Sequence, residues 1–137
     1  MNPHDLSASD ILVWGIVLHL FADWPLQTDW MAANKSNLRH PAGYVHAGIH
    51  GLLLSLIFGW AAIALAVLHL LIDTRKPLIW WGKAIGQTQP ANRIIFQRWQ
   101  YETEEIPVYD MGMEVRIWVD QVFHITCIAV AAILVTL

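Results

Sequence analysis

The chain has 137 residues, of which 56% are hydrophobic and only 14% are charged. Soluble domains carry roughly 25% charged residues, so this composition argues against a water-soluble protein and favours one integral-membrane domain over residues 1–137. The net charge of −3 gives no sign of a polyanionic partner, and we expect no nucleic-acid partner. The single cysteine, Cys127, cannot form an internal disulfide and is expected to pack inside a helix.

The first two predicted helices cover residues 8–24 and 41–58. Ser7 or Ser9 can cap the first helix, and it ends before Pro25 because proline disfavours helix in the residue that precedes it. The second helix opens with a proline in its first turn, where the missing N–H costs nothing. A polar loop is expected between them.

The third helix is predicted at residues 61–75, after a break at Gly59 and Trp60. Without that break, one helix would be about 45 Å long, whereas the hydrocarbon layer of a bilayer is about 30 Å thick. A fourth helix, residues 113–136, follows an insert over residues 77–112. The predicted fold is therefore all-α, a four-helix antiparallel bundle in the membrane, which is also compatible with an oligomer.

Positive charge predicts the orientation of this bundle. Cytoplasmic loops of membrane proteins are enriched in lysine and arginine. Every lysine and arginine lies in or beside the loops that join helices one to two and three to four, so both loops are predicted to be cytoplasmic and both termini to face the opposite side. The insert is expected to lie along the lipid headgroups or to form a cytoplasmic cap. The lysines and arginines are Lys35, Arg39, Arg75, Lys76, Lys83, Arg93, Arg98 and Arg116.

Each predicted helix carries one pair of histidine or aspartate residues spaced four apart. Residues at this spacing lie on one helix face, so each pair can direct two ligands at a common centre. The first and third helices run toward the cytoplasm, and in each of them histidine precedes aspartate. The fourth helix runs away from the cytoplasm, and in it aspartate precedes histidine. The four pairs are His19/Asp23, His46/His50, His69/Asp73 and Asp120/His124.

The reversed order places like residues at like depth, in two layers one helical turn, or about 6 Å, apart. Eight ligands suffice for two divalent metal ions and at most three. Zinc is the first choice, with iron or manganese as alternatives, because imidazole and carboxylate ligands suit all three. The competing interpretation is a buried proton-relay network without metal. The inner layer is His19, His50, His69 and His124, and the outer layer is Asp23, His46, Asp73 and Asp120.

Polar residues beside the cytoplasmic helix ends are candidates for catalysis. Asp29 could relay a proton, and Lys35 and Lys76 could bind an anionic substrate. Of the two remaining histidines, His40 is interpreted as a loop residue and His4 as part of the terminus. Gln27, Arg75 and Gln121 are further candidates for contacts around the ligands.

Four segments in this order, HLFADWPLQTDWMAANKS, HAGIHG, HLLIDTRK and DQVFH, resemble the bacterial and phage inner-membrane family called domain of unknown function 3307. The resemblance implies a bacterial inner-membrane location. A more distant likeness is to membrane-bound metal-dependent hydrolases and, through them, to zinc phospholipase C and the single-strand nucleases. It implies a zinc cluster that cleaves phosphodiesters and carries over to the pairs His19/Asp23 and His69/Asp73. The amino-terminal tryptophan ligand of those soluble enzymes has no counterpart at Met1.

The leading functional hypothesis is a metal-dependent hydrolase in the membrane that acts on a phosphoester or phospholipid, an anionic or lipid substrate, at the cytoplasmic face. A di-iron membrane oxidase or hydroxylase would use the same ligands for oxygen chemistry. A metal-ion carrier or sensor is the third hypothesis, because the inner histidines lie near the expected bilayer midplane. Eight strong ligands argue against a carrier, since transport requires weak binding.

Overall fold

The computed structural model describes residues 6–84 and 111–137, with the backbone alone for Lys83 and residues 111–116. The described residues form helices and no strand, which confirms the predicted all-α class. The helices are α1 (Ala8–Asp23), α2 (Asp29–Asn34), α3 (Pro41–Phe58), α4 (Ala61–Asp73), α5 (Lys76–Ala84) and α7 (Met111–Leu134).

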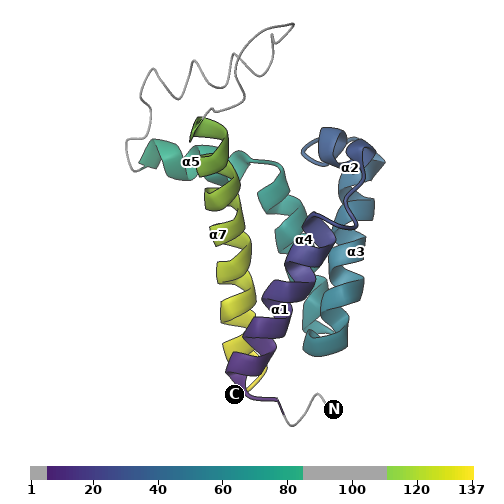
Figure 1. Cartoon of the computed structure of the whole chain (residues 1–137), viewed down its shortest axis with the longest axis vertical. Coiled ribbons are helices and arrows are strands. Elements are labelled where there is room, and N and C mark those ends of the chain that lie inside the picture. The colour runs from purple at the N-terminus through teal and green to yellow at the C-terminus, as the bar shows by residue number, and fades with distance from the viewer. Residues whose placement is uncertain (1–5, 85–110) are drawn as a thin grey trace, which may run out of the picture.

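Four of these helices form an antiparallel bundle, in which α1 packs against α3 and α7, and α4 packs against the same two helices (Figure 1). The start of α1 and the end of α7 lie at one end of the bundle. The short helices α2 and α5 lie at the opposite end (Figure 1). We call these the terminus end and the loop end.

Two helices lie where the sequence predicted a loop and an insert. Helix α2 begins after Thr28, whose hydroxyl accepts a hydrogen bond from the amide of Met31 at 3.3 Å. Such a side-chain cap satisfies one of the amides that a helix start leaves free. Helix α5 occupies the first part of the predicted insert, and the rest of that insert, residues 85–110, lies outside the described residues. Its predicted role as a cap or a headgroup-bound segment therefore stays a prediction.

The four long helices match their predicted positions to within two residues at either end. Ser7 caps α1 reciprocally with Asp10, since each backbone amide pairs with the other residue's side chain. The third predicted helix ends at Asp73 rather than at residue 75, because Arg75 adopts a left-handed backbone with φ of 63°. That conformation turns the chain into α5.

The terminus end of the bundle is filled by apolar side chains from all four long helices. Close approach of these helices depends on small residues. A Cβ atom on Gly15 would lie 2.7 Å from Cγ2 of Ile128, and one on Gly51 would lie 3.0 Å from Cβ of Ala66. Cys127 packs against this apolar core, as predicted. The core consists of Ile11, Leu54, Phe58, Ala62, Leu65, Ile128 and Ala132.

The outward faces of the long helices are also apolar. Leu52 on α3 is 72% exposed and Ile63 on α4 is 71% exposed, and Val17 and Val130 are half exposed on α1 and α7. Two helical segments, Pro41–Phe58 and Ile117–Leu134, are long and apolar enough to cross a membrane, whereas α4 is a shorter apolar helix.

Candidate metal centre

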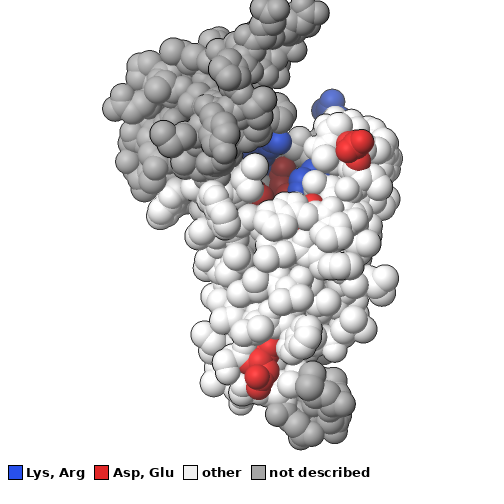
Figure 2. All heavy atoms as spheres, in the orientation of Figure 1, with Lys and Arg blue, Asp and Glu red and all other residues white. Residues whose placement is uncertain are grey.

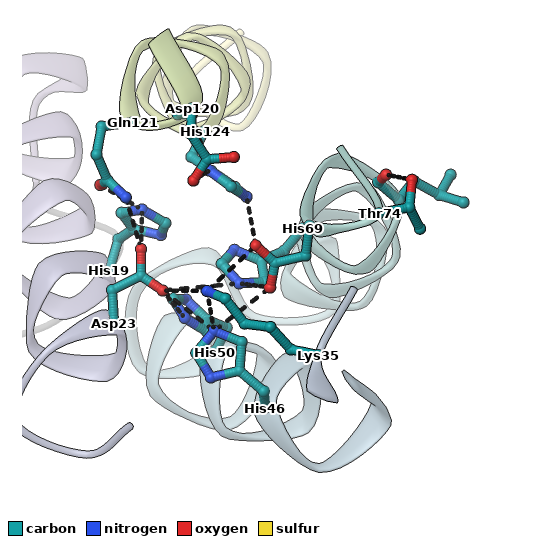
Figure 3. A network of polar contacts seen from close by, with 12 residues as sticks. His19, Asp23, Lys35, His46, His50, His69, Thr74, Asp120, Gln121 and His124 are labelled. Carbon is teal, nitrogen blue, oxygen red and sulfur yellow. Dashed lines mark hydrogen bonds and ion pairs between the residues drawn. The ribbon is translucent and has the colours of Figure 1, made fainter. Parts of the chain in front are cut away.

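All eight predicted ligand residues face one centre near the loop end, two from each long helix (Figure 3). The spacing of four residues places each pair on the inward face of its helix. Seven of the eight are at most 4% exposed. The side chain of Asp120 is the exception at 22%. Figure 2 shows acidic and basic atoms together in a hollow at this end, above a face that carries no charged residue until the terminus end.

The Asp23 carboxylate of α1 faces side chains from the other three long helices, with His69 of α4 the most distant at 3.9 Å. Its Oδ1 lies 3.1 Å from Nε2 of His46 and 3.2 Å from Nε2 of His50. Its Oδ2 accepts a hydrogen bond of 2.8 Å from the amide nitrogen of Gln121 and lies 3.3 Å from Nε2 of His19. Because both oxygens have partners from different helices, this carboxylate holds a fixed orientation.

The four histidines predicted as the inner layer lie ring against ring. The rings of His50 and His69 are stacked with centroids 3.6 Å apart, and those of His69 and His124 are 4.2 Å apart. The ring of His19 lies 5.0 Å from that of His124. Four imidazoles this close together can direct several ring nitrogens at one centre, and the neutral imidazole is the form in which histidine binds metals.

On the other side of the centre, Asp73 and Asp120 flank His124. The nearer oxygen of Asp73 lies 4.0 Å from Nε2 of His124, and an oxygen of Asp120 lies 3.6 Å from its Nδ1. Nδ1 also lies 3.0 Å from the backbone carbonyl of Asp120, to which it can donate. A histidine held in this way through Nδ1–H presents the lone pair of Nε2 to the centre, as metal ligands commonly do.

The potential ligand atoms divide into overlapping groups, each within 4.8 Å. Only two of these groups share no residue. One set comprises a carboxylate and three histidines, and the other comprises two carboxylates and a histidine. The third group shares His69 with one set and His124 with the other, and a neutral imidazole binds one ion through its single lone pair, so these two sets are the ones that can be filled together. We call them set A, Asp23, His46, His50 and His69, and set B, Asp73, Asp120 and His124.

His19 is the one predicted ligand outside both sets. It belongs instead to a third group with His69 and His124, which set A and set B already use. Its Nε2 lies 3.2 Å from the side-chain oxygen of Gln121, while the amide of the same glutamine holds Asp23. Between these histidines and the apolar core is a cavity of about 10 Å³, room for about one water-sized atom. His19 thus contacts both Asp23 and the glutamine that holds it, and its role as a metal ligand stays a prediction.

The charge of the cluster is unbalanced when the histidines are neutral. Three carboxylates contribute −3 and the Lys35 ammonium contributes +1, which leaves −2. Uncompensated charge is costly away from water. In addition, Nε2 of His124 is buried without a hydrogen-bond partner in the described part of the chain, and Nε2 of His69 faces Oδ2 of Asp73 at 3.2 Å. A divalent cation would supply the charge and use these lone pairs, so the donor set fits a metal ion.

Lys35, a predicted substrate-binding residue, lies in the centre itself. Its ammonium nitrogen is 3.3 Å from Oδ1 of Asp73, 3.6 Å from Oδ1 of Asp23 and 3.2 Å from Nε2 of His46. The close packing of α2 on α3 permits this, because a Cβ atom on Gly43 would lie only 2.8 Å from the backbone oxygen of Lys35. Glycine at position 43 therefore places the lysine over the site.

The other predicted catalytic residues lie elsewhere. Asp29 and Lys76 are exposed first residues of α2 and α5, and neither has a polar contact with the cluster among the described residues. His40 does more than occupy a loop, since its Nδ1 accepts a hydrogen bond from the amide of Ala42 and caps α3. His4 lies outside the described residues. Gln121, which the sequence suggested only as a candidate for contacts around the ligands, is buried. Its side chain bridges His19 and Asp23.

Comparison with known proteins adds one finding. The family described as "Protein of unknown function (DUF3307)" matches residues 11–137, which includes every predicted ligand. No curated protein and no solved structure matches the chain.

Proposed function

We propose a function from the site itself, because the chain belongs to the DUF3307 family and the family's description names no activity. The proposal is a metal-dependent hydrolase in the membrane that binds two divalent ions, zinc first, and cleaves a phosphoester or phospholipid at the loop end of the bundle. The observation that carries it is the pair of disjoint ligand sets, whose carboxylates and Lys35 give a formal charge of −2 when the histidines are neutral.

Set A would fill every coordination position of a zinc ion, whereas set B would leave one coordination position free. Set A offers four buried ligands, the number that zinc takes in structural sites, whereas set B offers three, as in zinc sites that keep a position for substrate. Set B contains Asp120, the site carboxylate that reaches the surface. Zinc ions here would polarise a phosphoryl oxygen and lower the pKa of the attacking water. Gln121 and His19 would keep the Asp23 carboxylate in its liganding orientation.

The membrane location rests on an inverted distribution of polarity. The buried centre is made of histidine and aspartate, while the outward faces of the four long helices are apolar. In water that arrangement would expose a large apolar surface, but in a bilayer it buries the polar groups inside the bundle, as membrane proteins do. Both termini would then lie on one side of a bacterial inner membrane, and the lysines and arginines of the loop end on the cytoplasmic side.

The apolar core favours an enzyme over a metal carrier. A carrier needs access to its site from both sides of the membrane. In the described structure, Leu54, Phe58 and Ile128 fill the bundle between the histidines and the terminus end. The centre is therefore approached from the loop end.

Hydrolysis is the first prediction. The purified full-length protein, loaded with zinc, should release nitrophenolate from bis(4-nitrophenyl) phosphate or a headgroup product from phospholipid vesicles, and chelation should abolish the release. His50→Ala, which removes a ligand of set A, is the control for contaminating hydrolases. Zinc-loaded protein that cleaves neither substrate above this control would refute the proposal. Bound iron with an oxygen-dependent absorption change would favour the di-iron oxidase instead.

Membrane insertion gives the second prediction. Leu52→Arg places a charge on the outward face of α3, where a bilayer would oppose it by about 2.5–3.5 kcal/mol. We expect the variant to lose integration, measured as the fraction that resists alkaline extraction from isolated membranes. Leu38→Arg, an exposed position in the loop before α3, is the matched control and should extract like the wild type. Equal resistance of both variants would contradict a lipid-facing α3.

A further inference from the structure

The Lys35 ammonium contacts one atom or more from each ligand set. Asp23 and His46 belong to set A, and Asp73 belongs to set B. The ammonium thus lies between the two proposed ion positions, held by the same atoms that would bind the ions (Figure 3). Its side chain is 18% exposed, so it also reaches the opening of the site.

We propose that Lys35 is a built-in competitor of the metal: ion binding displaces its ammonium, which then binds the anionic group of the substrate. This inference rests on the proposed function for the identity of the anion, a phosphate group. Because the ammonium is released only when an ion binds, the protein would bind an anion only after it has bound metal.

The exclusion follows from the chemistry of His46. Nε2 of His46 lies 3.2 Å from the lysine nitrogen and 3.1 Å from Oδ1 of Asp23, and an ion bound through Nε2 would occupy the one lone pair of that nitrogen. A ligated Nε2 cannot accept a hydrogen bond from the ammonium. A divalent ion at either set would also repel the ammonium from the carboxylates that now hold it. Both effects drive the lysine away from the centre.

The displaced ammonium has a defined direction of movement. The apolar core fills the bundle on the far side, and the backbone of Lys35 is fixed against Gly43, so the flexible four-carbon side chain can extend only toward the opening. There it would meet an incoming phosphate beside set B, where its positive charge offsets that of the anion. Before metal loading, the same ammonium is paired with Asp23 and Asp73 and is not available to an anion.

The test measures zinc affinity by competition with a chromogenic chelator, using the full chain in detergent. We expect Lys35→Met and Lys35→Gln to bind zinc about tenfold more tightly than the wild type, because the competing charge is gone. A misfolded variant cannot give this result, since misfolding weakens binding. Arg39→Met removes an exposed positive charge near the same end and should leave the affinity unchanged.

Anion binding is measured by equilibrium dialysis with micromolar radiolabelled inorganic phosphate. Zinc-loaded wild type should bind phosphate at least about tenfold more tightly than zinc-loaded Lys35→Met, and zinc-free wild type should bind as weakly as that variant. Zinc affinity that is unchanged or lower in both Lys35 variants would overturn the proposal, as would phosphate binding independent of zinc or of Lys35. Tighter zinc binding and lost phosphate binding in a protein that hydrolyses nothing would refute the hydrolase alone.

Discussion

Replacement of Asp23 by asparagine should remove one of two zinc ions from each chain and reduce hydrolysis to background. Asparagine keeps the shape of the side chain but removes the charge that faces Nε2 of His46 and His50. Loss of residues that merely orient a metal ligand costs 10–100-fold in affinity, so loss of a ligand should cost more than about 100-fold. Elemental analysis of the purified variant gives the zinc content, and nitrophenolate release gives the activity.

Asp120→Asn is the matched substitution in set B. It should retain the zinc of set A and lose the more exchangeable ion, because Asp120 belongs only to set B. The two variants together should therefore distinguish two positions with separate ligands. Equal zinc content in wild type and Asp23→Asn would contradict set A, and loss of both ions in each variant would indicate one shared site.

Metal removal should have the second large effect, on stability. An ion present at about a thousand times its dissociation constant stabilises the folded state by about 4 kcal/mol, and for a chain of this size that corresponds to roughly 15 °C in the midpoint of thermal unfolding. The reason is local: without metal, the centre holds three carboxylates, and the one ammonium there pairs with only two of them. The unfolding midpoint can be followed by intrinsic fluorescence of the eight tryptophans, with and without a chelator.

The control for that measurement is His50→Ala, in which a chelator should shift the midpoint less than in the wild type, because only the ion of set B remains to be removed. Readdition of zinc should restore the wild-type midpoint. An unfolding midpoint that does not respond to chelation in the wild type would support the buried proton-relay interpretation of the same residues.

The long helices and the convergence of the eight ligand residues could be predicted because both depend on local pattern. Apolar runs define helices, and a spacing of four places His19 and Asp23, or His69 and Asp73, on one helix face. Chain direction then orders the layers. The predicted location of this bundle in a membrane is a separate claim from its fold. Two helical segments, Pro41–Phe58 and Ile117–Leu134, have the length and composition expected of a membrane span.

The remainder depends on contacts between distant segments. Helix α2 is too short for a periodic pattern and is stabilised by the Thr28 cap and by packing on α3. Nearness in sequence to a ligand helix suggested Asp29 and Lys76, but both are first residues of short helices and point to solvent. The central position of Lys35 depends on the missing side chain of Gly43, which only the packed structure reveals.

The apolar core at the terminus end also constrains the order of events at the site. In the described part of the chain, that core closes the bundle on one side of the histidines, and the hollow in Figure 2 lies on the other side, at the loop end. If the protein is the proposed hydrolase, ions and substrate would share this entrance, and a bound substrate would block exchange of the ions behind it. Metal exchange would then be confined to the intervals when no substrate is bound, and product would have to depart by the route through which substrate arrived.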